Sequence, residues 1–447
     1  MTFHFTRASR RQLVIEAIDA QNSALSDIDR SRKYDKMSRS PYRFFRGTNH
    51  LFWADAWHDW RYYLFGGLLD SQTWLQGDAH VYNHGAFGDD HQGVHYGMDD
   101  FDDALIGDYQ YDLWRHAASM VLDAEENAGL SESQTRRAIR HLLTSYLDTL
   151  AAGLRGLSAD DIHVAYQNPP LRAFIDKVSR KRGVARQLAK WTCEDSDGRP
   201  RLDIARAKLG EIHADERARI ETALTEQYPA TLRRAGEHRR TQLRVRDVAR
   251  RLNAGTGSLG LHRFYALVSP IDEALDDLIL LDIKQQTRPP AYDCMTAAEK
   301  SRWRHAFEHE AHRHAEAFHA LSQHPDAYVG WLSLDDTWFS VRRRSPYKKD
   351  FPTHKIGGFK PYRALTRQWG RILAREHIRG AAALRPDDPG YFQRAVTARI
   401  GDDREEFKRV IVDFAFAYAE CTRRDWAAFV EARGPSSRTG PAAPRSR

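Results

Sequence analysis

Two acid-rich segments in the first quarter of the chain combine side chains that can bind metal ions and move protons. The first, "QGDAHVYN", places Asp78 five residues before Asn83. The second, "DDFDDA", contains Asp100 and Asp102. A carboxylate can orient and deprotonate a hydroxyl, while an amide oxygen and a second carboxylate are ligands that Mg²⁺ accepts. These residue types and spacings predict metal-assisted phosphoryl transfer.

The two segments resemble the catalytic and metal loops of the protein-kinase-like superfamily, in the style of aminoglycoside and homoserine-type small-molecule kinases. The resemblance implies that Asp78 is the catalytic aspartate and that Asn83 and Asp100 bind Mg²⁺. Asp102 stands where these kinases usually have glycine. Asp112, in "YDLWRHA", matches an aspartate that begins a helix and has a structural role.

A narrower resemblance is to DUF2252, a bacterial family named only as a domain of unknown function. It is carried by "KMSRSPYRFFRG", "GDAHVYN", "DDFDDA", "GTGSLGLHRFYALV" and "FAFAYAECTRRDW", and it covers residues 33 to 432. This resemblance implies no substrate. One departure from the kinase pattern is Gln76, where such kinases often have histidine. That position is usually a scaffold in such kinases, so the departure does not exclude the chemistry.

A polar structural loop and a zinc site are the alternatives for this region. Two H-x-x-x-H spacings are formed by four histidines: His80, His84, His91 and His95. On a helix such spacings could bind zinc. Three glycines would break any helix there: Gly85, Gly88 and Gly93. The sequence therefore favours polar loop histidines over a zinc site, with His80 steadying the loop.

The nucleotide half of a kinase site is expected later in the chain. "GTGSLG" fits the pattern G-x-G-x-x-G and supplies Gly255, Gly257, Ser258 and Gly260. Glycines allow backbone N–H groups to approach phosphates closely. A Rossmann fingerprint would open a helix, whereas a strand pattern follows here, as it does in a kinase glycine hairpin.

Lys284, in "LILLDIKQQ", follows an apolar strand pattern and resembles the kinase lysine that contacts the α- and β-phosphates. We expect it to lie across a cleft from Asp100 and to form an ion pair with a helix glutamate. Glu316 is the preferred partner, and Glu308 and Glu310 remain candidates. The alternative is a solvated lysine at the end of a strand.

The hydrophobic periodicity predicts an α+β chain. The resemblance to kinases implies a two-lobed, kinase-like fold. The catalytic loop precedes the glycine loop, so the order is circularly permuted, and the larger lobe is mainly helical. Four segments are expected. Residues 1–242 hold the catalytic and metal loops, 243–345 form a small β-rich nucleotide lobe, 346–432 complete the helical lobe, and 433–447 are a disordered tail.

Several local elements follow from turn and cap residues. Residues 50–75 predict one buried helix that ends at Gly66 and Gly67, and Ser131 is expected to cap a helix. Residues 296–322 predict one long helix. Two further strand patterns predict a hairpin that turns at the pair Asp335 and Asp336.

Composition excludes several classes of protein. The chain has 447 residues, of which 41% are hydrophobic, so it can bury a large core. Three cysteines without a CxxC pair indicate neither a disulfide framework nor a thiolate zinc site. No leader or membrane-spanning segment is expected, which predicts a cytoplasmic protein without a membrane partner. The formal net charge of +7 favours anionic partners.

The leading hypothesis is an enzyme, an ATP- and Mg²⁺-dependent phosphotransferase acting on a small molecule or a protein. An adenylyltransferase or a nucleotide-binding pseudokinase is the alternative. A nucleic-acid-binding protein, using "RKRGVARQLAK", is less favoured because no recognised motif supports it. Lys36, Arg43 and Arg46 could contact phosphate or an acidic substrate; alternatively, their segment is structural, with Phe44 and Phe45 packed inward.

Overall fold

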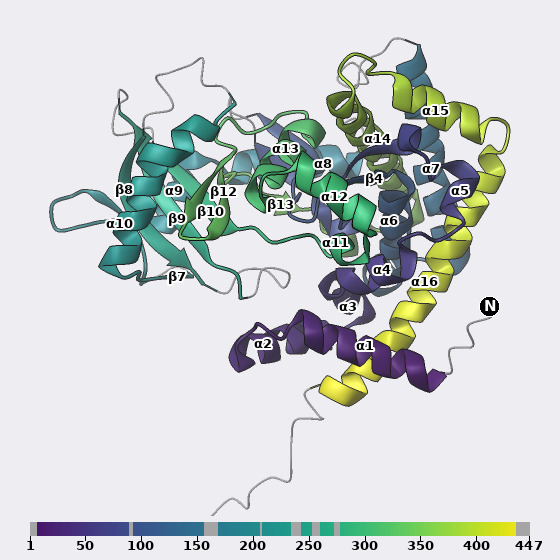
Figure 1. The fold of residues 1–447 in the computed structure, drawn as a ribbon, viewed down its shortest axis with the longest axis horizontal. Helices are drawn as coiled ribbons and strands as arrows, with labels where there is room; N and C mark the ends of the chain where they lie inside the picture. The colour runs from purple at the N-terminus through teal and green to yellow at the C-terminus, as the bar shows by residue number, and fades with distance from the viewer. Residues whose placement is uncertain are drawn as a thin grey trace, which may run out of the picture.

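The chain folds into a sheet-rich part and a helical part that pack against each other (Figure 1). The computed structural model describes residues 7–88, 93–155, 169–205, 208–233, 243–252, 260–271 and 278–434. The helix α1 (Arg7–Gln21) packs against α16 (Arg404–Arg433), which brings the two ends of the described chain together. The fold is therefore mixed α+β and mostly helical, as the sequence predicts.

Six strands form one antiparallel sheet in the order β11-β12-β10-β9-β8-β7. Their bounds are Leu209–Gly210 (β7), Leu243–Arg251 (β8), Arg263–Pro270 (β9), Ile279–Gln285 (β10), Gly330–Leu334 (β11) and Thr337–Arg343 (β12). The strand patterns from residue 243 onwards are confirmed. So is the predicted hairpin, in which Leu334 pairs with Thr337 and Asp335 takes a positive φ of 51°.

The two faces of the sheet differ because side chains alternate along each strand. On β10, Leu281 and Ile283 are buried in a cluster with residues of α10 (Ala214–Thr222) and the turns that follow it. Asp282 and Lys284 point to the opposite face, towards a polar cavity. Residues 209–232 thus pack with the sheet, so the boundary expected at 242 falls inside this unit.

The helical part has one large core shared by segments from both ends of the chain. The helices α6 (Gln110–Asp123), α7 (Glu132–Leu154), α14 (Phe359–Leu384) and α16 all contribute buried residues. A Cβ on Gly370 would lie 2.1 Å from the carbonyl oxygen of Leu142, so only glycine permits the close approach of α14 to α7. The predicted cap is confirmed, because the Ser131 side chain accepts from the backbone N–H of Gln134.

Two predicted helices are each interrupted. Residues 50–75 contain α4 (Asn49–Ala56), the short α5 (Tyr62–Phe65) and the strand β1 (Gln72–Leu75). Residues 296–322 contain α12 (Ala297–Ala306) and α13 (Glu310–Leu321). Between them Phe307 is extended and buried in the large core, and the His309 side chain caps α13 by accepting from the N–H of His312.

Smaller elements complete the described chain. They are α2 (Asp27–Met37), α3 (Pro41–Gly47), β2 (His84–Gly88), β3 (Val94–Met98), β4 (Leu105–Asp108), α8 (Pro169–Lys181), α9 (Val184–Trp191), β5 (Thr192–Glu194), β6 (Pro200–Leu202), α11 (Ala291–Cys294), β13 (Lys349–Asp350) and α15 (Tyr391–Ile400). β1 pairs with β4, and β13, β2 and β3 form a small separate sheet. In the described part of the chain, no helix is long and apolar enough to cross a membrane.

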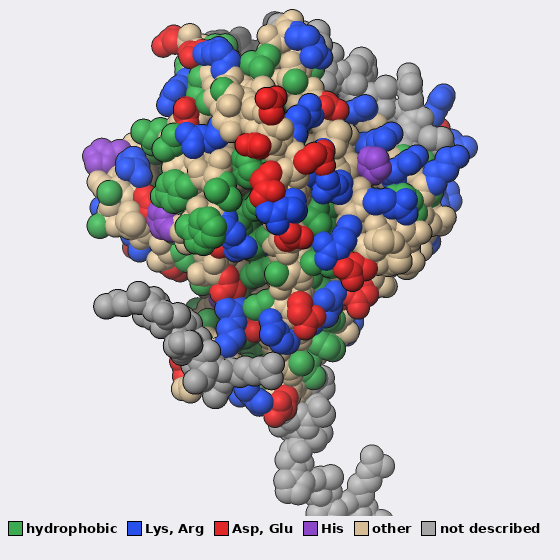
Figure 2. Space-filling view, turned by 90° about the vertical axis from the view of Figure 1, so that its right-hand side faces the viewer, with side chains coloured by type: hydrophobic (Ala, Val, Ile, Leu, Met, Phe, Trp, Pro, Cys, Tyr) green, Lys and Arg blue, Asp and Glu red, His purple; other side chains and the backbone are tan. Residues whose placement is uncertain are grey.

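Acidic and basic side chains are interspersed on the face that presents α16 (Figure 2). Exposed ion pairs also join α16 to α7: Arg404 pairs with Asp148, and Arg140 pairs with Glu405. Exposed pairs of this kind contribute little to stability, about 0–1 kcal/mol each. Because the two kinds of side chain alternate, the described part of this face has no large patch of a single charge sign.

Arg313 joins the sheet-rich part to the helical part. Its side chain is fully buried and extends from α13. One guanidinium nitrogen donates to the carbonyl oxygen of Ala104 at 2.7 Å, and another donates to those of Asp102 at 2.7 Å and Thr287 at 3.2 Å. Its Nε donates to Glu310 at 2.7 Å. One side chain therefore fixes a helix, the second acid-rich segment and the end of β10.

Replacing Arg313 with methionine should destabilise the protein by about 3–5 kcal/mol, because the buried carbonyls and Glu310 lose their donor. Urea unfolding followed by tryptophan fluorescence would measure the loss. Arg304→Met on the exposed side of α12 is the matched control and should change stability by less than about 0.5 kcal/mol. Equal unfolding midpoints for the two variants would contradict this account of Arg313.

Candidate functional site

The two acid-rich segments and β10 line one cavity of about 530 Å³. Asp78, Asn83 and Asp100 contribute from the helical part, and Lys284 contributes from the sheet. Lys284 lies 182 positions after Asp102 in the chain, yet the two side chains form an ion pair. The structure thus brings together four of the residues singled out from the sequence.

Asp112 holds the backbone of the first acid-rich segment. It lies in the first turn of α6, and its carboxylate accepts from the N–H groups of Gln76 at 2.7 Å and Gly77 at 3.1 Å. The same carboxylate lies 3.3 Å from Nε2 of His377, whose Nδ1 lies 2.8 Å from the Tyr146 hydroxyl. Asp112 therefore has the structural role that the kinase resemblance implies.

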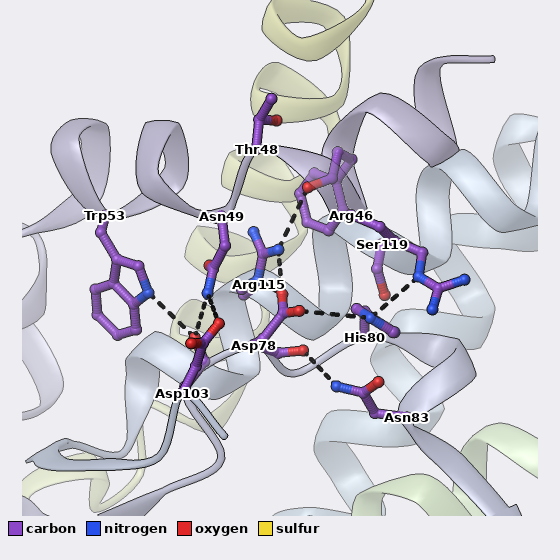
Figure 3. Close-up of polar contacts among 12 residues, drawn as sticks. Arg46, Thr48, Asn49, Trp53, Asp78, His80, Asn83, Asp103, Arg115 and Ser119 are labelled. Carbon is purple, nitrogen blue, oxygen red and sulfur yellow. Dashed lines mark hydrogen bonds and ion pairs between the residues drawn. The ribbon is translucent and has the colours of Figure 1, made fainter. Parts of the chain in front are cut away.

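Gly77 occupies a turn that only glycine fits. Its φ is +82°, and a Cβ would lie 1.9 Å from the carbonyl oxygen of Asp103. The Gly77 carbonyl accepts from the side chains of Asn49 and Trp53, both at 3.1 Å, and Asn49 also donates to the Asp103 carboxylate at 2.8 Å (Figure 3). The first and second acid-rich segments are locked together at this point.

Asp78 forms a two-nitrogen ion pair with Arg115 (Figure 3). Arg115 Nε donates to Oδ1 of Asp78 at 2.7 Å, and its guanidinium lies over the rings of Phe45 at 4.2 Å and Phe52 at 5.1 Å. Burial raises the pKa of Asp78, and the charge of Arg115 opposes that rise. The Asp78 side chain is 20% exposed, towards the cavity.

His80 and Asn83 orient the groups around Asp78. Nε2 of His80 accepts from Nε of Arg46 at 3.2 Å and lies 3.6 Å from Oδ2 of Asp78. Burial lowers the pKa of His80 well below its usual value, so the ring is neutral. Nδ2 of Asn83 donates to the carbonyl oxygen of Asp78 at 2.8 Å. Since the amide nitrogen is engaged, the oxygen of Asn83 is the atom available to a cation.

Asp102 is the partner of Lys284. Its other oxygen accepts from Nε2 of Gln286 at 2.9 Å and lies 3.7 Å from Nε2 of His314. Although burial opposes the change, the charges of Lys284 and His314 lower the pKa of Asp102 well below its usual range. Burial and the neighbouring Asp102 raise the pKa of Asp100 to about 6.

The expected pair between Lys284 and Glu316 is not what the structure shows. Glu316 forms its ion pair with Arg233 and lies 3.8 Å from Nε2 of His312. Two positions along a helix correspond to a rotation of about 200°, so the side that presents His314 to Asp102 turns Glu316 away. The other candidates are also placed elsewhere: Glu308 is exposed, and Glu310 binds Arg313.

Most of the glycine-rich segment lies outside the described residues, including Gly255, Gly257 and Ser258. Gly260 is described and has a positive φ of 86°, just before β9 begins. The next residue, Leu261, lines the cavity. The described end of the segment therefore reaches the rim of the cavity that contains Lys284.

The oxygen atoms near Asp100 fit a magnesium ion that takes its remaining ligands from phosphate groups and water. Within the described ranges, no group of three or more His, Cys, Asp or Glu side chains is arranged to hold a metal. Mg²⁺ needs only one or two protein oxygens when phosphates and water complete its shell. Asn83 and Asp100 line the same cavity, and a cation there would relieve the repulsion between Asp100 and Asp102.

Two residues central to the site were missed in the sequence. Arg115 pairs with Asp78, and Arg313 fixes the second acid-rich segment. The first could have been found, because Arg115 follows Asp112 by three positions and so lies on the same face of a helix. No sequence pattern identifies Arg313, since its partners at the second acid-rich segment and after β10 are backbone carbonyls.

Comparison with protein families gives one match. A family model described as "Uncharacterized protein conserved in bacteria (DUF2252)" matches residues 30–432. No curated protein and no solved structure matches the chain.

Gly77→Ala should lower stability by about 3 kcal/mol or more, because the new Cβ meets a backbone oxygen as well as an unfavourable φ. Gly129→Ala is the matched control: Gly129 also has a positive φ, 63°, but nothing lies within 4 Å of its Cβ position. That variant should lose only about 1–2 kcal/mol. Urea unfolding compares the two, and equal losses would show that contact with Asp103 does not constrain the loop.

Proposed function

Because the chain belongs to the DUF2252 family, whose description names no activity, we infer its function from the cavity and propose an ATP- and Mg²⁺-dependent phosphotransferase of kinase-like fold. The observation that carries the proposal is the meeting of Lys284 with Asp78, Asn83 and Asp100 in one cavity. A lysine, two oxygen ligands for the metal and a carboxylate that can accept a proton are the groups that phosphoryl transfer requires. The acceptor is a small molecule or a protein.

The layout of the sheet supports a kinase-like nucleotide lobe. The glycine-rich segment connects β8 to β9, Lys284 lies on the third strand, and α13 follows before the hairpin β11–β12. Kinases place their phosphate loop, lysine and adjoining helix in this order. Here the carboxylate segments precede the sheet, and α14 to α16 return to complete the helical part, which supports a circularly permuted arrangement.

Each side chain has a distinct part in the proposed reaction. Asp78 accepts the proton of the acceptor hydroxyl, and Arg115 keeps its carboxylate oriented and ionised. Lys284 contacts the α- and β-phosphates, and Asp102 holds that lysine in place when no nucleotide is present. Asn83 and Asp100 would hold Mg²⁺, which when bound neutralises the phosphate charge.

ATP should bind at least about tenfold more tightly with Mg²⁺ than without it, and Asp100→Ala should remove most of that difference. Isothermal titration calorimetry measures both affinities. Asp402→Ala, at an exposed turn, removes the same charge and should leave the metal dependence unchanged. If the wild-type protein binds ATP equally well with and without Mg²⁺, the metal assignment is wrong.

Asp78→Asn should reduce transfer at least about 100-fold while leaving nucleotide affinity within a factor of about three, because the amide oxygen can still accept from Arg115 but cannot take up the proton. Lys284→Met should weaken nucleotide binding by about 1–3 kcal/mol as well as transfer. ADP release, with water as the default acceptor, measures transfer; pyrophosphate release would instead indicate adenylylation. Full activity in Asp78→Asn would refute the proposed role of Asp78.

A further inference from the structure

A group of cationic side chains surrounds Lys36, which lines the cavity. We call it the basic rim; its members are Arg32, Lys36, Arg39, Arg43 and Lys208. Lys36 and Arg43 line the cavity itself. Burial lowers the pKa of Lys36, and the charges of the other four members lower it further.

Opposing charge reaches the rim at two points: Arg32 lies 3.7 Å from Asp29, and Glu126 lines the cavity together with Arg43. Within the described part of the chain, no carboxylate forms an ion pair with Lys36, Arg39 or Arg43. Glu126, which also lines the cavity, is already engaged: its carboxylate accepts from the backbone N–H of Tyr42 at 2.6 Å. Like charges repel more strongly as they come closer. An anion bound at the rim would reduce this repulsion and would itself be stabilised by the cations.

The apolar residues of α3 account for the fold of this segment but not for its charges. Phe44 and Phe45 are buried, as the structural alternative predicts, and Phe44 packs against Phe429 of α16. Arg43 and Arg46 are exposed on the other side of the same short helix and reach the cavity. A segment needed only for packing would not require cations on its cavity side.

The basic rim and the proposed phosphoryl-transfer centre are connected through α3. Arg46 donates to His80, and His80 lies beside Asp78 (Figure 3). Arg43, one turn earlier on the helix, belongs to the rim. A molecule whose hydroxyl lies at Asp78 can therefore extend along the cavity towards Arg43 and Lys36.

We propose that the basic rim binds the anionic end of the acceptor, so that the acceptor is a small molecule carrying a phosphate or carboxylate group. This inference rests on the proposed function, since it places the acceptor hydroxyl at Asp78. In the reaction, the acceptor oxygen bonds to the γ-phosphorus and gives its proton to Asp78. The bond from that phosphorus to the β–γ bridging oxygen breaks, and ADP leaves with the electron pair. A cationic acceptor such as an aminoglycoside would be repelled by the rim.

Inorganic phosphate is a direct probe of the rim. Calorimetry would titrate it into protein saturated with Mg²⁺ and a non-hydrolysable ATP analogue. Phosphate should bind the wild-type protein, and the double variant Lys36→Ala/Arg43→Ala should bind it at least tenfold more weakly with unchanged nucleotide affinity. The control Arg11→Ala/Arg30→Ala removes the same charge from exposed pairs with Glu431 and Asp27 and should bind phosphate as the wild type does.

Three outcomes would overturn the inference: no phosphate binding, equal binding by both double variants, or an equal loss of nucleotide affinity in Lys36→Ala/Arg43→Ala. The last would assign the rim to the nucleotide. If the wild-type protein fails to bind the nucleotide, the proposed function is refuted instead. Titration of phosphate into the protein without nucleotide then tests whether the rim binds anions. Weaker phosphate binding by Lys36→Ala/Arg43→Ala than by the wild type supports an anion site, and equal affinity overturns it.

A second measurement tests the class of acceptor. Transfer of labelled γ-phosphate would be compared for sugar phosphates, hydroxy acids and aminoglycosides. Anionic acceptors should be phosphorylated by the wild-type protein, with KM at least tenfold higher in Lys36→Ala/Arg43→Ala and kcat little changed. Transfer to aminoglycosides, with none to anionic acceptors, would overturn the inference. Circular dichroism and melting curves of the variant establish that it is folded.

Discussion

The ion pair between Lys284 and Asp102 is the contact on which the arrangement of the site depends. It joins a strand of the sheet to the loop that carries Asp100, across the junction of the two parts of the fold. Two features reinforce it: Gln286 donates to the same carboxylate, and Arg313 holds the backbone of the same residue. In a buried setting a charge needs such partners, because an unpaired charge would be strongly destabilising.

This pair also sets the electrostatics of its neighbours. Asp102 stays ionised opposite Lys284, and its charge together with burial raises the pKa of Asp100 to about 6. Of the two carboxyl groups, Asp100 therefore holds a proton more readily than Asp102.

The first acid-rich segment is held in place by a different set of contacts. Its backbone is held from one side by Asp112 and from the other by Asn49 and Trp53, and its turn fits only glycine. Arg115 then fixes the side chain of Asp78. These contacts come from α4 and α6, so the position of the carboxylate is set by helices of the core rather than by the loop itself.

The sequence by itself determined the features that depend on local patterns. Alternating apolar residues predicted β8 to β12, the capping residue Ser131 marked the start of α7, and spacing predicted that Asp78 and Asn83 face one site. Tertiary structure decided which charged groups meet. Lys284 pairs with Asp102 rather than Glu316. The burial of Phe307 and Arg313 sets the rotation of α13 about its axis, and that rotation cannot be read from the local pattern of apolar residues. Long-range packing likewise placed residues 209–232 with the sheet, since this contact joins segments whose separation in sequence says nothing about their distance in space.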